Sequence, residues 1–317
     1  MRAYDFGEKY FLRDVMGAYM TTLGENHSNI VIVNADLAAT SRNKNFVKTF
    51  PNRSFNVGIA EQDMVSFAAG LAHEGFMPFA FSMAPFVAMR ACEQCRTDVA
   101  YENLNVRLVG TYAGVSGGIS GATHWGLEDV AIMSSMGHMT VLEPSDPNQA
   151  KKMLEAVIEY QGPVYIRISV EPTISLYDEN YEYKIGQATV ANDGTDGAFI
   201  CSGITVKYAL EAAIHIREKY GKEIQVIDMH TIKPLDQKAV IDAAKTGNIV
   251  VAQDHVKFGG LGNMVAEILS ENRLNPKFVN LGIPDYFVPM AHALYLYHKF
   301  GYDTEGLEKA MITLLDL

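Results

Sequence analysis

The chain has 317 residues, of which 48% are hydrophobic and 20% are charged, and its formal net charge is −11 at pH 7. This balance is typical of a globular protein with room for two domains. Because the chain is acidic, has no basic tract and has no apolar run long enough to span a bilayer, we expect neither a nucleic-acid nor a membrane partner. Three cysteines cannot form a disulfide framework and the start of the chain does not resemble a signal peptide, which predicts a cytoplasmic protein.

The first half of the chain alternates between short β-branched or aromatic runs and helical patterns. Strands are predicted at 30–33, 55–57, 76–81, 106–110, 139–142 and 164–168. Helices are predicted at 7–23, 60–75, 85–99, 127–136 and 147–159. Strand–helix alternation of this kind predicts an α/β fold with a parallel sheet that is covered by helices on both faces.

The composition changes near Glu171, where a polar, tyrosine-rich stretch begins that is typical of an interdomain linker. A second alternating set follows, with strands predicted at 198–201, 224–227, 249–252 and 277–280 and helices at 206–219, 237–245, 261–270 and 304–315. We therefore expect two domains, at 1–175 and 187–317, of which the second is a smaller α/β domain.

A carboxylate lies at the predicted junction of a strand and a helix. The apolar run at 55–57 ends at Gly58, and the helical pattern that contains Glu61 begins near Ala60. Ligands of open α/β sheets bind where the strands end, although acidic residues also favour the first turn of a helix because of its dipole. The flanks of Glu61 at 58–60 and at Met64 are apolar, and a carboxylate in apolar surroundings tends to hold or share a proton. Glu61 is therefore a candidate catalytic residue.

The segment around Glu61 resembles the glutamate-bearing segment of the pyrimidine-binding domain of transketolase-type enzymes, which use thiamine diphosphate. The resemblance extends from about Arg13 to the end of the chain and corresponds to the second and third domains of a full-length transketolase. It implies a pyrimidine-binding domain followed by a transketolase C-terminal domain. It also implies that Glu61 hydrogen-bonds a ring nitrogen of the aminopyrimidine and so promotes loss of the proton from the thiazolium C2 carbon.

Two further segments resemble cofactor-binding parts of the same family. Segment 34–37 is similar to the one whose aspartate lies near the thiamine at the subunit boundary, although an aspartate such as Asp36 also caps turns. Phe86 corresponds to an aromatic residue that stacks on the aminopyrimidine, although aromatics at helical spacing are more often core residues. Met83 stands where common transketolases have an aromatic residue, and methionine can fill such a pocket by flexible packing. The resemblance thus assigns Asp36, Glu61, Met83 and Phe86 to the cofactor.

A glycine-rich loop from Tyr112 to His124 follows the predicted strand at 106–110. Its last residues resemble the loop whose histidine contacts the hydroxyls of the donor sugar, so we expect His124 to be catalytic and substrate-binding; a histidine that caps the next helix is the alternative. Common transketolases have an Asp where this chain has Ser120 and a His where it has Tyr112. Because those two residues contact the sugar or its phosphate, the differences favour an unusual donor, such as a branched or modified ketose phosphate.

Arg13, Thr40 and Arg167 are the candidate phosphate ligands. Arg side chains are suited to bidentate contact with phosphate oxygens. Arg13 stands in the same position relative to Asp36 as a phosphate-binding Arg of the family, and Thr40 follows where the family often has a hydroxyl residue. Arg167 ends a predicted strand, whose end faces the expected site. A surface arginine or a capping threonine would explain these residues equally well.

Two other motifs are expected to be architectural. Asp254-His255 and the glycines that follow resemble the last loop–helix unit of the transketolase C-terminal domain. Cys92 and Cys95 have CxxC spacing, but they lie in a predicted helix without a second cysteine pair, so we expect them to be structural.

The chain lacks the Gly-Asp-Gly motif that binds Mg²⁺ and diphosphate in thiamine-diphosphate enzymes, and we assign it no metal ligands. Because the diphosphate and its metal need hard oxygen ligands, we expect an N-terminal transketolase subunit on a separate chain to supply them. The resemblance therefore implies the C-terminal subunit of a split transketolase, with the cofactor bound where the chains meet. We expect a heterotetramer that contains two copies of each chain.

The leading hypothesis is a transferase subunit that moves a two-carbon ketol unit from a ketose, expected to be a phosphate, to an aldose in carbohydrate metabolism. The β subunit of a 2-oxo acid dehydrogenase has a similar length and the same two domains, but the Thr123-His124 pair argues against it. A synthase that joins pyruvate to an aldose phosphate is normally one chain. A non-catalytic partner of the same fold is a further alternative, which the presence of Glu61 disfavours.

Overall fold

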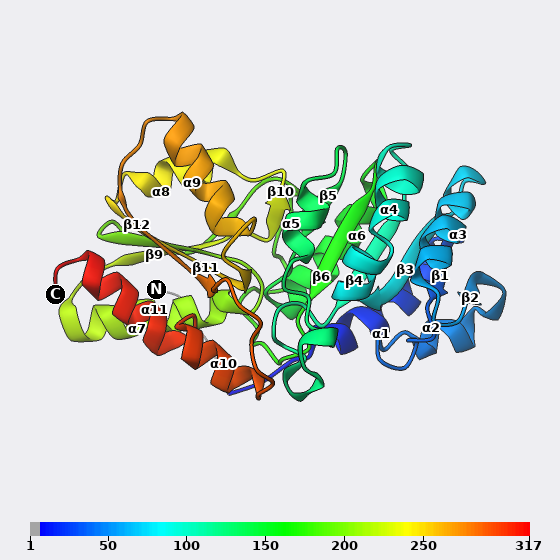
Figure 1. The fold of residues 1–317 in the computed structure, drawn as a ribbon, viewed down its shortest axis with the longest axis horizontal. Coiled ribbons are helices and arrows are strands. Elements are labelled where there is room, and N and C mark those ends of the chain that lie inside the picture. The colour runs from blue at the N-terminus through cyan, green and yellow to red at the C-terminus, as the bar shows by residue number, and fades with distance from the viewer. Residues whose placement is uncertain (1–6) are drawn as a thin grey trace.

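The computed structural model describes residues 7–317, which form two sheets side by side (Figure 1). The first sheet has seven strands in the order β10-β5-β6-β4-β3-β1-β2. Their bounds are β1 (Ile30–Asn34), β2 (Ser54–Asn56), β3 (Met77–Met83), β4 (Arg107–Thr111), β5 (Thr140–Leu142), β6 (Val164–Ile168) and β10 (Thr231–Lys233). The pairs among β1 to β6 are all parallel, which confirms the predicted parallel sheet.

Helices cover both faces of the first sheet. One face carries α1 (Leu12–Asn26), α2 (Lys44–Thr49) and α6 (Pro147–Glu159), and the other carries α3 (Glu61–His73), the helical segment 86–100 and α5 (Asp129–Ser134). Alternate residues of a strand pack against the helices on opposite faces of the sheet. Ile32 of β1 packs in the cluster of α1 and α6, whereas Val33 packs in the cluster of α3. Such strands are buried on both faces, which explains their continuous apolar sequence. Within residues 7–317, no helix combines the length and the apolar character of a membrane span.

The helix predicted at 85–99 is the least regular element of this layer. It consists of the π-helical turns η2 (Phe86–Arg90) and η3 (Cys95–Ala100), joined by the short helix α4 (Cys92–Gln94). π-helical turns are rare and are frequent at functional sites. Here η2 contains Phe86, one of the predicted cofactor-binding residues.

The second sheet has five strands in the order β12-β11-β8-β9-β7. Its strands are β7 (Thr189–Asn192), β8 (Gly197–Cys201), β9 (Ile224–Asp228), β11 (Asn248–Val256) and β12 (Lys277–Ile283), and its helices are α7 (Thr205–Tyr220), α8 (Gln237–Ala244), α9 (Leu261–Glu271), α10 (Ala293–Phe300) and α11 (Thr304–Leu314). All strands and helices predicted in this half are present. The sequence did not predict α2, β7, β10 or α10.

Strand β10 belongs by sequence to the second half of the chain but extends the first sheet. It pairs antiparallel with β5, with Thr231 opposite Leu142, and Figure 1 shows it between the two sheets. The first sheet is therefore mixed rather than purely parallel. The two halves are joined by backbone hydrogen bonds as well as by side chains.

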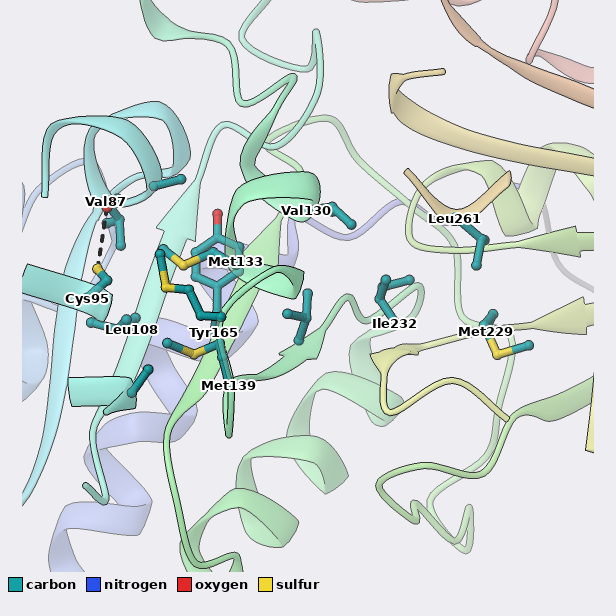
Figure 2. Close-up of a cluster of buried hydrophobic side chains, with 14 of the residues drawn as sticks. Val87, Cys95, Leu108, Val130, Met133, Met139, Tyr165, Met229, Ile232 and Leu261 are labelled. Carbon is teal, nitrogen blue, oxygen red and sulfur yellow. Dashed lines mark hydrogen bonds between the residues drawn. The ribbon is translucent and has the colours of Figure 1, made fainter. Parts of the chain in front are cut away.

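One hydrophobic cluster runs through both halves. Figure 2 shows Val130 and Met139 of the first half in the same cluster as Ile232 and Leu261 of the second. The stretch between β6 and β7, which we expected to be a linker, has no helix or strand, but its Tyr177 is buried. The two halves therefore share a core instead of being separated by an exposed linker.

The CxxC cysteines are free thiols within the helical layer. Cys95 is buried, its Sγ lies 3.5 Å from the carbonyl oxygen of Val87 (Figure 2), and burial raises the pKa of its thiol. A buried thiol with a raised pKa is a weak nucleophile, which agrees with a structural role.

Candidate active site

The expected site residues gather at the carboxyl ends of parallel strands in the first sheet. Asp36 follows β1, Glu61 begins α3 after β2, Phe86 follows β3 and the loop 112–124 follows β4. Because these strands are neighbours in one parallel sheet, their carboxyl ends meet at a single edge. Open α/β sheets bind ligands at that edge.

Glu61 is the first residue of α3, and its side chain is only 1% exposed. Its Oε1 accepts a hydrogen bond of 3.0 Å from the Ser82 hydroxyl, and its Oε2 accepts one of 2.6 Å from Nη1 of Arg90. The positive end of the helix dipole also favours a carboxylate here. The expectation that Glu61 lacks polar and ionic partners is therefore wrong: the Ser82 hydroxyl and the Arg90 guanidinium hold the buried carboxylate.

Arg90 connects Glu61 to an aromatic pair. Cζ of Arg90 lies 4.3 Å from the centre of the Phe86 ring, and the Phe86 and His124 ring centres are 5.6 Å apart with the rings edge-on. Nδ1 of His124 lies 2.9 Å from the Thr123 hydroxyl. Glu61, Arg90, Phe86 and His124 thus form a contiguous set from three separate segments, which we call the acid–aromatic cluster.

The acid–aromatic cluster has the chemistry that an aminopyrimidine ring requires. The Glu61 carboxylate has lone pairs beyond those used by Ser82 and Arg90 and can take part in a further hydrogen bond. Phe86 is half-buried and Met83 is buried at the end of β3, and an aromatic face and a thioether both suit contact with an aromatic ring. These residues fit the pyrimidine half of thiamine diphosphate. In the part of the chain that the structure describes, no three His, Cys, Asp or Glu side chains are grouped to hold a metal.

Asp36 has a left-handed backbone conformation, with φ of 59°, at the end of β1. Its N–H donates to Oδ1 of Asn56 at 3.0 Å, and Nδ2 of Asn56 donates back to Oδ1 of Asp36 at 3.1 Å. The N–H of Gly58 donates to the same Asn56 Oδ1 at 3.0 Å. The ends of β1 and β2 are thereby fixed together, and Gly58, which takes part in this contact, stands three residues before Glu61. Strained conformations of this kind cost about 1–3 kcal/mol and concentrate at functional sites.

Tyr112 is the second left-handed residue at this edge, with φ of 63° at the end of β4. Its ring lies over Gly117, where a Cβ would come within 2.7 Å of Cδ1 of Tyr112. Ser120 is exposed in the turn η4 (Gly118–Ser120), and His124 ends the turn η5 (Ala122–His124). The loop therefore carries Tyr112, Ser120 and His124 at the same edge as Glu61, and their contacts with a sugar stay predictions.

Arg13 lies in the first turn of α1, and Thr40 lies in the loop after β1. Nε of Arg13 is buried without a hydrogen-bond partner among residues 7–317, and so is the hydroxyl of Ser41, which follows Thr40 in the sequence. Buried polar atoms without partners are uncommon and call for a ligand, a water or an ion. Arg13 and Thr40 therefore stay predicted anion ligands.

Arg167 does not have the role expected from its position in the strand. Its buried side chain pairs with Asp129 at 2.9 Å and Glu143 at 2.6 Å, and it donates to the carbonyl oxygens of Gly126 and Asp254 at 3.1 Å each. Burial alone would lower the pKa of Arg167, but the two carboxylates raise it above its ordinary value. Each nitrogen of the guanidinium already donates to a buried acceptor, and the side chain joins the two halves of the chain, so the prediction of a phosphate ligand is wrong.

Sequence reasoning missed three residues that hold the site together: Ser82, Arg90 and Asn56. A signal existed for Arg90, which follows Phe86 by four residues in one helical pattern, a spacing that places two side chains on the same face. No pattern connects Asn56 with Asp36, because the two residues are 20 positions apart and meet only when β1 and β2 pair.

Comparison with known proteins finds a matching domain family for each half of the chain. The family model described as transketolase, pyrimidine binding domain, matches residues 8–172, and the one described as transketolase, C-terminal domain, matches residues 186–307. A protein of Methanocaldococcus jannaschii described as a transketolase C-terminal section is 38% identical over 303 residues, which cover 95% of each chain. The 6-deoxy-6-sulfo-D-fructose transketolase subunit SqwH of Clostridium sp. (strain MSTE9) is 37% identical over 304 residues, which cover 96% of this chain and 94% of that protein.

A solved structure described as a split gene transketolase, inactive beta4 tetramer, has the same fold along its whole length. It is 34% identical to this chain, with a TM-score of 0.88, and the match covers 98% of this chain and 99% of that one. The sequence matches and the fold agree with the two-domain order that the structure shows. The chain therefore belongs to the transketolase family, as a transferase subunit made of the pyrimidine-binding and C-terminal domains.

Proposed function

We propose that this chain is the C-terminal subunit of a thiamine-diphosphate-dependent transketolase, which moves a two-carbon ketol unit from a ketose to an aldose. The observation that carries the proposal is the acid–aromatic cluster, in which the buried Glu61 carboxylate, the Phe86 ring and the loop residue His124 are contiguous. The names of two similar proteins, a transketolase subunit and a split gene transketolase, support the same class of reaction.

Each residue of the cluster has a distinct part in the proposal. Bound thiamine diphosphate supplies a nucleophilic carbon that can carry a two-carbon unit. Glu61 holds and moves a proton at the pyrimidine ring nitrogen, while Phe86 and Met83 form the surface on which that ring packs. Arg90 fixes the orientation of the Glu61 carboxylate through its hydrogen bond to Oε2. Asp36 lies at the rim of the cofactor site, where Asn56 holds it.

The residues that we propose to bind the substrate lie in the glycine-rich loop, in the first turn of α1 and in the loop after β1. His124, Ser120 and Tyr112 contact the donor sugar, and Arg13 with Thr40 binds the anionic group at its far end. Ser120 and Tyr112 are neutral, which favours a donor that differs from the common ketose phosphates. The similarity to a sulfo-fructose transketolase subunit supports a donor whose anionic group is a phosphate or a sulfonate.

A partner chain completes the site in this proposal. It is an N-terminal transketolase subunit, which holds the diphosphate and Mg²⁺ and assembles with this chain as a heterotetramer in the cytoplasm. The apolar side chains of Ile59, Met89 and Ile119 are exposed and lie within a few positions in the sequence of Glu61, Arg90 and His124, respectively. Contiguous patches of exposed apolar side chains mark surfaces that another protein covers, and we propose that these three residues belong to one such surface.

Reconstitution tests the proposal. The chain is co-expressed with a candidate partner that contains a Gly-Asp-Gly motif, and the complex is assayed with thiamine diphosphate and Mg²⁺. The donors are ketose phosphates, 6-deoxy-6-sulfo-D-fructose, pyruvate and other 2-oxo acids, each with and without aldose phosphates. We expect ketol transfer from a ketose that requires both chains and the cofactor.

The other outcomes identify the alternatives. Turnover of 2-oxo acids alone would indicate a dehydrogenase β subunit, and condensation of pyruvate with an aldose phosphate would indicate a synthase. A complex that binds thiamine diphosphate but turns over no donor would indicate a non-catalytic partner. If the chain by itself binds thiamine diphosphate and transfers ketol units, the proposal that two chains share the cofactor site is wrong.

A further inference from the structure

The glycine-rich loop 112–124 is closed at its base by backbone hydrogen bonds. The N–H of Gly114 donates to the carbonyl oxygen of Gly126 at 2.7 Å, and the N–H of Gly126 donates to the carbonyl oxygen of Tyr112 at 3.0 Å. The loop is therefore a compact unit, and its orientation depends on what holds this base.

The second half of the chain holds the base through Asp254, at the carboxyl end of β11. The buried Oδ1 of Asp254 accepts a hydrogen bond of 3.0 Å from the N–H of Val115 and another of 3.0 Å from the Tyr302 hydroxyl. The carboxylate also fills the space beside Gly114, where a Cβ would lie 1.9 Å from Cγ of Asp254. Gly114 has φ of 61°, so glycine is required there for its conformation and for this close approach.

The other arm of the loop is fixed to the same strand. Nη2 of Arg167 donates to the carbonyl oxygens of Gly126 and Asp254 at 3.1 Å each. The N–H of Val256 donates to the carbonyl oxygen of Leu127 at 3.0 Å. Both arms of the loop therefore end on the last residues of β11.

The fixed base is connected to the acid–aromatic cluster by the loop itself. The buried Trp125 donates from Nε1 to the carbonyl oxygen of Gly118 at 3.1 Å and so bridges the loop. Its neighbour His124 contacts the Phe86 ring. A shift of the loop at Val115 therefore changes the place of His124 relative to Phe86.

We infer that Asp254 is a positioning residue for the reaction: it holds the glycine-rich loop in the orientation that presents Tyr112, Ser120 and His124 to the donor sugar. Through this residue the C-terminal domain takes part in substrate binding without touching the substrate. The inference rests on the proposed ketol transfer and deepens it. It also extends the architectural role expected for Asp254 from the sequence.

Three variants of the reconstituted complex test the inference. Asp254→Ala removes the acceptor for Val115, whereas Asp254→Asn keeps an acceptor oxygen and places its amide nitrogen where Oδ2 has no hydrogen-bond partner within residues 7–317. Tyr302→Phe is the matched control, because it removes the other donor to the same oxygen and leaves the bond to Val115. The measurements are kcat, KM for the ketose donor, thiamine diphosphate affinity and hydrogen exchange of peptide 113–118.

We expect Asp254→Ala to raise the donor KM about tenfold, while kcat and cofactor affinity change by less than about threefold, and to speed amide exchange at 113–118. Asp254→Asn restores the donor KM to within about twofold of the parent, and Tyr302→Phe stays within the same range. A normal donor KM in Asp254→Ala, or an equal effect of Tyr302→Phe, would overturn the inference.

Two further results keep the test decisive. If Asp254→Ala does not fold, Gly114→Ala disturbs the same contact from the loop side, and an unchanged donor KM in that variant would contradict the inference. If the parent complex transfers no ketol unit, the proposed function fails, whereas the exchange of peptide 113–118 still shows whether Asp254 holds the loop.

Discussion

Nη1 of Arg90 donates a hydrogen bond of 2.6 Å to Oε2 of Glu61, and the same guanidinium lies over the Phe86 ring. The Glu61 side chain is buried, whereas that of Arg90 is 46% exposed. One arginine at the rim therefore orients the buried acid and contacts the aromatic surface beside it. The geometry predicts that Arg90 matters for the chemical step more than for sugar binding.

Arg90→Met in the reconstituted complex is expected to lower kcat about tenfold, which corresponds to about 1.4 kcal/mol. The effect is modest because Arg90 is half-exposed and solvent screens its charge. The donor KM is expected to stay within about twofold, since the variant does not touch the loop. Arg96→Met, at an exposed arginine of the same helical segment, is the control and leaves kcat unchanged. A tenfold change in donor KM at constant kcat would place Arg90 at the substrate instead.

His124→Asn is expected to raise the donor KM about three- to tenfold, the loss that follows from one hydrogen bond of about 0.5–1.5 kcal/mol. Binding of thiamine diphosphate is expected to persist, because Glu61 and Phe86 are intact. His73→Asn, at an exposed histidine of α3, is the matched control. The measurement is steady-state kinetics with the best donor of the panel, and an unchanged KM would remove His124 from the substrate site.

Arg13→Met and Arg167→Met distinguish a ligand from a structural arginine. Arg13→Met is expected to raise the KM for anionic donors about tenfold or more, since a charge-assisted hydrogen bond contributes about 1.5–3 kcal/mol, and to leave the melting temperature unchanged. Arg167→Met leaves Asp129 and Glu143 buried without their cation and is expected to destabilise the fold by about 3–5 kcal/mol. Thermal unfolding and donor KM are measured for both variants. Equal stability of Arg167→Met and the parent would contradict the structural role of this arginine.

Asp228→Asn tests the pH dependence of stability. Burial raises the pKa of Asp228 from 3.8 to about 7, and its Oδ2 accepts hydrogen bonds from Ser145, Gln149 and Tyr177, with Asp146 nearby. The folded carboxyl binds its proton more tightly than the unfolded one, so its stabilisation is present below about pH 4 and is lost as the pH rises through about 7.

The parent is therefore expected to lose stability relative to Asp228→Asn between these two pH values. Each pKa unit corresponds to about 1.4 kcal/mol, so the difference reaches a few kcal/mol. Urea unfolding of both proteins at several pH values measures it. Parallel pH profiles would show that Asp228 does not titrate in this range.

The regular elements could be predicted because their apolar patterns are continuous. Strand β1 is buried on both faces and begins with the β-branched run Ile30-Val31-Ile32-Val33. Helix α6 begins at Pro147 after a capping Asp146. Strand β10 could not be predicted, because three residues, Thr231–Lys233, form a strand only by pairing with β5 of the other half. The π-helical turns of segment 86–100 likewise lack a sequence signal that separates them from an ordinary helix.

Candidate site residues could be assigned where a single sequence segment carries the signal. They could not be assigned where a side chain's role depends on residues that are distant in the chain. Glu61, Phe86 and His124 were assigned because their segments resemble those of transketolases, and the structure brings the three side chains together, while their roles stay predictions. The position of Arg167 at a strand end suggested a ligand, but its direction is fixed by carboxylates that are 24 and 38 residues away in the chain. Strand position alone therefore does not decide whether a side chain faces the site or the core.

The most direct test of the proposed chemistry is the turnover of the Glu61→Gln complex. Gln keeps the size of the side chain but cannot hold and move the proton, so we expect the complex to assemble and bind thiamine diphosphate while kcat falls at least about a hundredfold. Glu74→Gln, at the exposed end of α3, is the matched control and is expected to behave as the parent. Ketol transfer by Glu61→Gln at the parental rate would contradict the catalytic role of the acid–aromatic cluster.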